Sequence, residues 1–394
     1  MPFSLLQSEI QTFIKANTEA SLIKLALQKN PFSNVDWRLI IEQIACRQKA
    51  KDKLPTWFIT DEIIYPNKIS MEQTSSEKTA AYKASLVSGN SIIDLTGGFG
   101  VDNYYFSKQF QTVVHCEMNE DLSKIVKHNF QKLNIENCEC YAGDSFDILK
   151  KINTNFDCIY IDPSRRNDSK GKVFMLKDCL PNVIDLMDFY YQYSNNVLIK
   201  TAPILDITAG LNELKNVKKI HIVAVDNEVK ELLWEISKDY LETIEIVSVN
   251  LKKEQSEYFQ YTLSNNLTSV NYSLPKTYLY EPNAAIMKSG GFNEVAFQFD
   301  LDKLHLHSQL YTADVIKDFP GRIFKIERCM PYQKSDMKTF LEGTKANVTT
   351  RNFTDSVDEI RKKWKIKEGG NQYCFFTTDM NNRKIVLLCA KIET

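Results

Sequence analysis

From about residue 91 the chain alternates short apolar runs with helix-length amphipathic stretches, and this pattern restricts the fold more than any other feature. The apolar runs, which we predict to be strands, cover residues 91–94, 112–117, 156–162, 196–200 and 219–225. Amphipathic stretches such as 121–133 and 180–193 lie between them. Strands without strict alternation, separated by helices, form parallel sheets covered on both faces. We therefore predict an α/β domain, with a closing antiparallel hairpin over 244–252 and 257–264.

The flanking regions have other patterns. Trp37, Ile40, Ile41 and Ile44 follow the spacing of one buried helical face. After about residue 270 the pattern changes, and in the tail it predicts a strand (322–329), a helix (334–343), a strand (347–353), a helix (355–364) and two strands (373–378 and 384–391). We predict an N-terminal helical domain over 1–70, a central α/β domain over 71–268, a small segment over 269–320 and an α+β module over 321–394.

The distribution of charge separates the tail from the rest of the chain. The 394 residues carry a net charge of −1, and 43% of them are hydrophobic, enough for more than one core. Residues 321–394 contain 15 Lys and Arg against 9 Asp and Glu, which leaves 34 against 41 for the other residues, a balance of +6 against −7. A basic module on an acidic body favours a polyanionic partner such as nucleic acid. An ordinary solvated lysine face is the alternative.

The cysteines and the N-terminus indicate a compartment. The nine cysteines are scattered, several within apolar runs, which is typical of small buried side chains in a reducing environment. Cys138 and Cys140 are too close for the usual zinc spacing, so we predict no metal site. The chain has no signal-peptide pattern and no apolar run of membrane-spanning length. We expect a cytoplasmic protein.

The first strand of the α/β region ends in Asp94-Leu-Thr-Gly-Gly-Phe-Gly100. Gly98 and Gly100 permit a tight turn and let the backbone approach a ligand, with Gly97 and Thr96 beside them. Ligands of open α/β sheets bind beyond the carboxyl ends of strands. Position 103 is Asn, so this is not the dinucleotide fingerprint with its third glycine. A purely structural turn is the alternative.

Acidic residues follow the next two strands. Glu117, with Met118 after it, stands 17 residues past Gly100, where a carboxylate can accept hydrogen bonds from both hydroxyls of a ribose. Asp144 and Ser145 follow a further strand between the runs at 112–117 and 156–162, which we count as the third, and this aspartate can contact an adenine amino group. Taken singly, Glu117 could be a solvent-exposed glutamate at the end of a strand, and Asp144 could be a helix N-cap.

The fourth strand ends in Asp162-Pro-Ser-Arg-Arg166. Arg165 and Arg166 suggest contact with phosphate or carboxylate, because a guanidinium matches those oxyanions. A turn with solvated arginines is the alternative. Four glycine or acidic signals thus stand at four successive strand ends, and the combination is more specific than any member.

Six segments together are distinctive. They are 71–84 (MEQTSSEKTAAYKA), 94–102 (DLTGGFGVD), 162–166 (DPSRR), 225–233 (VDNEVKELL), 278–285 (YLYEPNAA) and 319–322 (FPGR). They resemble the bacterial class I methyltransferases that carry a C-terminal THUMP-like domain, and the resemblance covers about residues 57–394. Asp162-Pro163 stands where nucleic-acid amino-methyltransferases carry a [D/N]-P-P-[Y/F] loop, although Ser and Arg replace the last two positions.

The resemblance implies a Rossmann-like methyltransferase domain over 71–268, a ferredoxin-like segment over 269–320 and a THUMP-like domain over 321–394. It implies S-adenosylmethionine as cofactor and a nitrogen of an RNA base, in tRNA or rRNA, as target. The implied catalytic residues are Asp162, Pro163, Ser164 and Arg165. The implied cofactor residues are Gln73, Ser76, Thr79, Asp94, Thr96, Gly97, Gly98, Gly100, Glu117, Met118, Asp144, Ser145 and Asp162.

Some features have more than one interpretation. Lys200 is either a substrate contact or a solvated lysine, and Glu228 and Glu231, in a predicted loop-to-helix segment, read as surface ion-pair partners. The tail aromatics Phe324, Tyr332, Phe340, Phe353 and Trp364 either stack on bases or belong to a core. The alternative functions are a non-enzymatic RNA-binding or assembly protein, a nicotinamide-dependent oxidoreductase and a small-molecule methyltransferase.

Overall fold

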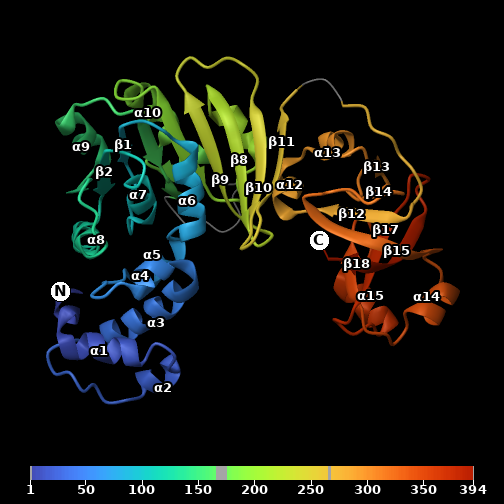
Figure 1. Cartoon of the computed structure of the whole chain (residues 1–394), viewed down its shortest axis with the longest axis horizontal. Helices are drawn as coiled ribbons and strands as arrows, with labels where there is room; N and C mark the ends of the chain where they lie inside the picture. Colours follow the sequence, from blue (N-terminus) through green and yellow to red (C-terminus); the bar gives the residue numbers. More distant parts are fainter. Residues whose placement is uncertain (1, 166–174, 265–267, 394) are drawn as a thin grey trace. The chain divides into compact units, whose positions relative to one another are not determined.

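The computed structural model describes residues 2–165, 175–264 and 268–393 (Figure 1). The chain divides into two compact units, one of Met1–Ile220 and Glu231–Glu242 and the other of His221–Lys230 and Thr243–Thr394. Each unit contains hydrophobic clusters of its own. The finer domain boundaries expected from the sequence stay predictions. Among the described residues, no helix combines the length and the apolar composition that crossing a membrane requires.

The first unit begins with helices. They are η1 (Pro2–Leu6), α1 (Ser8–Ala16), α2 (Leu22–Ala26), α3 (Trp37–Lys53), α4 (Pro55–Ile59), α5 (Lys68–Gln73) and α6 (Glu77–Leu86). Asp36 caps α3 by accepting a hydrogen bond from the backbone N–H of Arg38. Ile40 and Ile44 are fully buried, as the helical spacing predicts.

A sheet of nine strands has the order β11-β10-β8-β9-β7-β4-β1-β2-β3. Its strands are β1 (Ser91–Asp94), β2 (Thr112–Glu117), β3 (Cys138–Ala142), β4 (Cys158–Ile161), β7 (Asn196–Thr201), β8 (Val217–Val225), β9 (Glu228–Ser237), β10 (Glu245–Leu251) and β11 (Glu257–Thr262). The pairings β3-β2, β2-β1, β1-β4 and β4-β7 are parallel. The α/β fold class predicted from the sequence is therefore confirmed.

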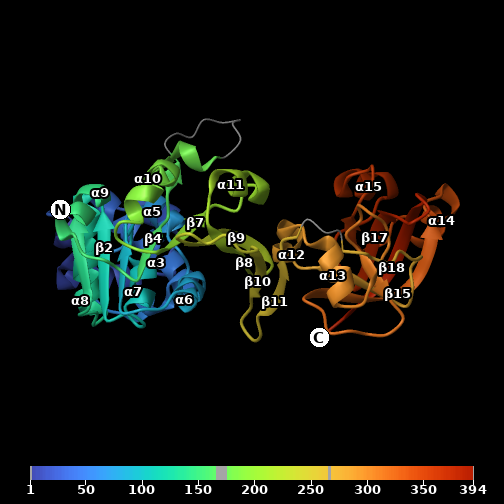
Figure 2. The same ribbon diagram turned by 90° about the horizontal axis from the view of Figure 1, so that it is seen from above.

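Helices cover both faces of the parallel strands, with α7 and α8 on one face and α9 and α10 on the other (Figure 2). The helices of this region are α7 (Val101–Phe106), α8 (Glu120–Lys132), α9 (Ser145–Ile152), α10 (Val183–Tyr190) and α11 (Ile207–Glu213). Phe146 of α9 and Phe189 of α10 pack with ring centroids 4.3 Å apart. The short elements β5 (Ser164–Arg165), η2 (Leu176–Asp178) and β6 (Cys179–Leu180) lie between β4 and α10, and β5 pairs with β6.

Two expectations about the end of this sheet have different outcomes. The predicted hairpin is confirmed, because β10 and β11 pair antiparallel. The predicted loop-to-helix segment at Glu228–Glu231 is wrong, since these residues begin β9, which runs antiparallel to β7. The physical reason is the turn before it. Asp226 and Asn227 both have positive φ, +48° and +67°, which is the two-residue turn that reverses a strand into a hairpin.

The second unit contains a sheet of seven strands in the order β13-β14-β12-β15-β18-β17-β16. The elements are β12 (Tyr278–Pro282), α12 (Ala284–Ser289), α13 (Phe292–Gln298), β13 (Asp302–Lys303), β14 (Tyr311–Ala313), β15 (Gly321–Pro331), α14 (Lys334–Phe340), β16 (Asn347–Thr350), α15 (Val357–Trp364), β17 (Gln372–Thr378) and β18 (Lys384–Ile392). The order of helices and strands predicted for the tail is confirmed.

The tail aromatics belong to the interior of this unit. Phe324 is fully buried and Trp364 is 7% exposed. Tyr332, Phe340 and Phe353 are partly buried and pack against the same hydrophobic cluster as Trp364. Their alternative interpretation, as core residues, is therefore the one that the structure supports.

Candidate functional site

The loop after β1 is held by a threonine that joins two strand ends. Oδ1 of the buried Asp94 accepts hydrogen bonds from the backbone N–H of Thr96 (2.8 Å) and from its hydroxyl (3.3 Å). The Thr96 hydroxyl accepts a hydrogen bond from the backbone N–H of Asp162 (2.6 Å), just after β4. Thr96 thereby links the carboxyl ends of β1 and β4.

Glycine stands at three positions of this loop for different physical reasons. A Cβ at Gly97 would lie 2.2 Å from Cδ2 of His115, and one at Gly100, where φ is +78°, would lie 2.8 Å from both Val126 and Phe130. These two positions have no room for a side chain. Gly98 has φ +53°, and an added Cβ would meet only the carbonyl oxygen of Thr96, at 3.8 Å. At Gly98 the loop therefore presents its backbone to open space.

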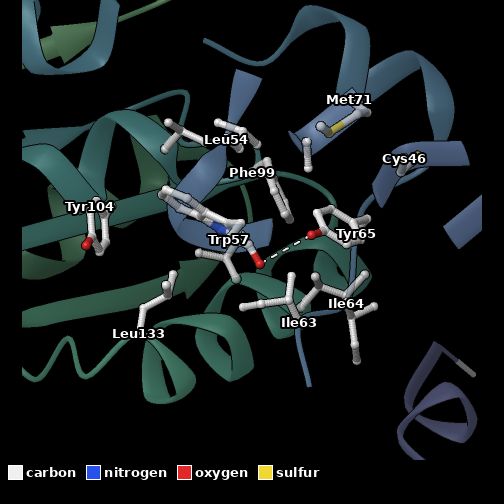
Figure 3. Close-up of a cluster of buried hydrophobic side chains, with 14 of the residues drawn as sticks. Cys46, Leu54, Trp57, Ile63, Ile64, Tyr65, Met71, Phe99, Tyr104 and Leu133 are labelled. Atoms are coloured by element: carbon white, nitrogen blue, oxygen red, sulfur yellow. Dashed lines mark hydrogen bonds between the residues drawn. The ribbon is translucent and has the colours of Figure 1, made fainter. Parts of the chain in front are cut away.

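Phe99 anchors the same loop in a hydrophobic core. Its side chain is 3% exposed and lies among Trp57, Tyr65 and Met71 (Figure 3). The Phe99 ring centroid is 6.3 Å from that of Trp57. The packing of Phe99 therefore fixes the loop, while the backbone at Gly98 stays open.

Glu117, at the end of β2, contacts the loop directly. Its Oε2 accepts a hydrogen bond from the backbone N–H of Gly98 (2.9 Å), and Oε1 accepts one from the backbone N–H of Asn119 (2.7 Å). Each carboxylate oxygen has a second lone pair, so two acceptor positions remain. Met118, the next residue, is 72% exposed and offers an apolar surface at the same strand end.

The end of β3 lies next to Glu117, because the backbone N–H of Gly143 donates to the carbonyl oxygen of Glu117 (2.9 Å). Asp144 is the N-cap of α9, and its Oδ1 accepts from the backbone N–H groups of Phe146 (2.8 Å) and Asp147 (3.4 Å). Ser145 is the first residue of that helix. The structure thus shows a capping role for Asp144, and its contact with a cofactor stays a prediction.

The loop after β4 brings Asp162 to the glycine loop. Oδ2 of Asp162 forms an ion pair with the ammonium of Lys200, at the end of β7. Lys200 is therefore neither solvated nor isolated. Pro163 is buried, and the exposed Ser164 belongs to β5. The backbone of Arg165 lies in β5 as well, but its side chain and all of Arg166 lie outside the described residues.

The residues predicted on the N-terminal side of the pocket have mostly local contacts. Ser76 caps α6 by accepting from the backbone N–H of Thr79 (3.2 Å), and Gln73 is exposed at the end of α5. From the same segment, Ser75 reaches α7, where its hydroxyl donates to Oδ2 of Asp102 (3.0 Å). The role of Gln73, Ser76 and Thr79 in cofactor binding stays a prediction.

Burial changes the acid–base properties near the loop. It raises the pKa of Asp94 to about 7. Burial disfavours the charged form of Lys200 too, but the carboxylates of Asp162, Glu231 and Asp102 outweigh it and raise the pKa of Lys200 above its ordinary value. Within residues 2–165, 175–264 and 268–393, no group of three or more His, Cys, Asp or Glu is arranged to hold a metal ion.

The chain is similar to known families of proteins and to solved structures. Family models match residues 75–176 (Conserved hypothetical protein 95), 278–320 (ferredoxin-like domain) and 321–391 (THUMP domain-like). The crystal structure of a candidate methyltransferase from Porphyromonas gingivalis W83 is 29% identical, covers 98% of each chain and superposes with a TM-score of 0.86. These matches support a class I methyltransferase with a C-terminal THUMP-like domain.

Other similarities are confined to part of this methyltransferase. A candidate methyltransferase from Escherichia coli is 17% identical over 41% of this chain and 86% of its own, with a TM-score of 0.32. A tRNA (uracil-54, C5)-methyltransferase from Pyrococcus abyssi, in complex with S-adenosyl-L-homocysteine, is 17% identical over 41% of this chain and 38% of its own, with a TM-score of 0.32. Among curated proteins, none matches this chain.

Two charged residues beside the site of this methyltransferase differ from expectation, because Lys83 was not predicted and Glu231 was predicted at the surface. Lys83 is fully buried, and its ammonium lies 3.0 Å from carboxylate oxygens of both Asp102 and Glu231. Lys83 stands three residues after Ala80 and one before Ala84, both buried, so its place on an apolar helix face was a readable signal. The surface ion pair expected for Glu231 is wrong, because this residue is 2% exposed. Glu228 does pair with Lys230, as expected.

Proposed function

We propose that this methyltransferase uses S-adenosylmethionine and modifies a nitrogen of an RNA base. One observation carries the proposal: Thr96 bonds both to Asp94 of the glycine loop and to the backbone of Asp162. A cofactor held by the loop and a substrate atom held by Asp162 would therefore be neighbours, as direct transfer requires.

The donor groups around the loop fit an adenosyl cofactor. The free lone pairs of Glu117 suit the two ribose hydroxyls, and the exposed Met118 suits the face of an adenine. The open backbone at Gly98 allows close approach of the ligand. When it is bound, S-adenosylmethionine supplies a methyl group already activated by its sulfonium. The proposed cofactor residues are Gln73, Ser76, Thr79, Asp94, Thr96, Gly97, Gly98, Gly100, Glu117, Met118, Asp144, Ser145 and Asp162.

Asp162 would orient the substrate. With Oδ2 in the ion pair with Lys200, its Oδ1 makes no hydrogen bond within the part of the chain that the structure describes. An N–H of the target base would donate to this oxygen, which places the nitrogen lone pair toward the methyl group. Pro163 and Ser164 would shape the loop, and Arg165 and Arg166 would contact a phosphate.

The proposal of RNA as substrate rests on the tail. Residues 321–391 match a THUMP domain-like model, and residues 321–394 carry a charge of +6 from 15 basic and 9 acidic residues. Basic side chains on a folded module give affinity for a phosphate backbone that falls as salt rises. We propose the cytoplasm as the place of the reaction, because buried thiols such as Cys158 and Cys374 suit a reducing compartment.

The test is methyl transfer from labelled S-adenosylmethionine to RNA from cells in which the gene has been deleted, followed by identification of the labelled nucleoside. We expect a labelled N-methylated base, and a loss of about 100-fold or more in kcat for Asp162→Ala, well beyond its loss of affinity for the cofactor. Asp188→Ala is the control, since Asp188 is an exposed aspartate on α10.

Two outcomes contradict the proposal in different ways. Full transfer by Asp162→Ala would remove the role assigned to that residue. Salt-dependent RNA binding by the wild type without any transfer would favour the non-enzymatic alternative.

A further inference from the structure

Five side chains of the first unit form a row of alternating charge that ends at the candidate catalytic loop. In order they are Asp162, Lys200, Glu231, Lys83 and Asp102, which we call the charge row. Lys200 pairs with Oδ2 of Asp162, and the ammonium of Lys83 lies 3.0 Å from Oε2 of Glu231 and 3.0 Å from Oδ1 of Asp102.

Sheet geometry supplies the middle link. Lys200 of β7 lies opposite Leu233 of β9 in the antiparallel register. Glu231 stands two residues from Leu233, so its side chain is on the same face of the sheet as Lys200. Oε1 of Glu231 is buried and makes no hydrogen bond among the described residues. Lys200 and Lys83 both oppose the effect of burial, which raises the pKa of Glu231.

Exposure falls along the charge row from Asp162 to Lys83 and is low again at Asp102. The side chains of Lys83 and Glu231 are 0% and 3% exposed, those of Asp102 and Lys200 are 12% and 13%, and that of Asp162 is 33%. The far end is fixed, because the hydroxyls of Tyr160 and Ser75 both donate to Oδ2 of Asp102 at 3.0 Å. The most exposed member is therefore the one at the glycine loop, and the others are held behind it.

A buried row of this kind is poor evidence for stability. Well-packed apolar side chains in place of buried ion pairs often leave a protein as stable or more stable, because ions lose much solvation on burial. The effect of the charge row is instead to fix the positions of its side chains. It holds Lys200 between two carboxylates, and Lys200 then occupies one oxygen of Asp162 and leaves the other for a ligand.

We propose that Glu231 is a positioning residue for methyl transfer, acting through Lys200 on the Asp162 carboxylate. This inference rests on the proposed function and gives the 228–231 segment, which had no chemical role, a place in it. Since the oxygen that Lys200 leaves is an acceptor, the target nitrogen must carry at least one hydrogen, as an exocyclic amino group does. The nitrogen would form a bond to the methyl carbon as the carbon–sulfur bond of S-adenosylmethionine breaks. S-adenosylhomocysteine would leave and the proton of the nitrogen would pass to solvent, so no further reactant is needed.

The experiment compares Glu231→Gln, Lys200→Met and the double variant in the transfer assay with RNA from gene-deleted cells. Gln keeps an acceptor for Lys83, so Glu231→Gln should fold. We expect each single variant to lower kcat by about 10- to 100-fold, with the KM for S-adenosylmethionine and the affinity for S-adenosylhomocysteine changed less than about 2-fold. The kcat of the double variant should fall no further than that of the more impaired single variant, because the two residues act in series.

The matched control is Glu228→Gln on the same strand, whose partner is the exposed Lys230, and we expect wild-type kinetics from it. Lys200→Arg keeps the charge with another donor geometry and should fold if Glu231→Gln does not, and its kcat should again fall with KM kept. Unchanged kcat in folded Glu231→Gln or Lys200→Arg, or losses that multiply in the double variant, would overturn the inference alone. Absence of transfer by the wild type would overturn the proposed function and the inference with it.

Discussion

Gly97 is the residue of the glycine loop with the least space. An alanine there would place its Cβ 2.2 Å from the His115 ring, which is buried and donates from Nε2 to the carbonyl oxygen of Gly98 (3.2 Å). We expect Gly97→Ala to lower the free energy of unfolding by about 3 kcal/mol, the upper end of the range for overpacked core substitutions. Urea unfolding of the purified variant measures this.

The comparison variant is Gly98→Ala. Its Cβ would meet open space, so the expected cost is only the positive φ, about 1 kcal/mol. Equal costs in the two variants would contradict the crowding described at Gly97.

Asp94 gives a prediction for pH. Burial raises its pKa to about 7 from 3.8, so between these values the folded protein holds a proton that the unfolded chain has lost. Its contribution to stability is present at low pH and is lost as pH rises through about 7. Asp94→Asn keeps an acceptor for Thr96 and removes the ionisation. We expect it to be more stable than wild type at pH 8 by about 1 kcal/mol or more, with the difference vanishing toward pH 4.

Urea unfolding of both proteins at pH 4, 6 and 8 measures that difference. A difference that does not depend on pH would show that Asp94 does not titrate in this range.

At this scale, local patterns and long-range contacts differ in what the sequence reveals. Gly97, Gly98 and Glu117 were predicted because their signals are short-range, a glycine loop and a strand end. The pairing of Lys83 with Glu231 was missed because it spans 148 positions, and the apolar helix face that Lys83 shares does not say which carboxylate it meets.

The hairpin of β8 and β9 is the element that the sequence analysis described incorrectly. Periodicity identifies a strand but not its direction. The strand that leads into Val225-Asp-Asn-Glu228 could therefore be the last strand of a parallel sheet or the first strand of a hairpin. The direction depends on the backbone at Asp226 and Asn227, whose positive φ values form the turn. Antiparallel β9 then brings Glu231 beside Lys200, which a helix at this position would not do.

Asn227 makes that turn testable. Its Oδ1 accepts a hydrogen bond from the backbone N–H of Ala284 (2.7 Å), and its φ is +67°. We expect Asn227→Ala to cost about 2 kcal/mol, from the lost hydrogen bond and from the strain of a positive φ. Asn227→Gly keeps the φ and loses only the hydrogen bond, so it should cost about 1 kcal/mol. Chemical denaturation of both variants separates the two effects. An equal loss of unfolding free energy in the glycine and alanine variants would show that backbone strain at positive φ does not contribute.

For the whole chain, the order of elements was more predictable than the arrangement of the site. The tail was predicted element by element because its strands and helices are short and divided by clear turns such as Pro320-Gly321. The basic charge of the tail indicated a partner class, but the aromatics expected beside the cations are largely core, Phe324 and Trp364 among them. Composition shows which side chains a module has, and only packing decides which of them reach its surface.

The central claim is that the turn after β1 and the Glu117 carboxylate hold an adenosyl cofactor. Isothermal titration with S-adenosylhomocysteine tests it without knowledge of the RNA. We expect saturable one-to-one binding by the wild type, no binding of NAD, and an affinity at least about tenfold lower in Glu117→Gln, equivalent to about 1.4 kcal/mol. Glu120→Gln, an equal change at the exposed start of α8, should bind like the wild type. Wild-type affinity in Glu117→Gln, or binding of NAD in place of S-adenosylhomocysteine, would contradict the account.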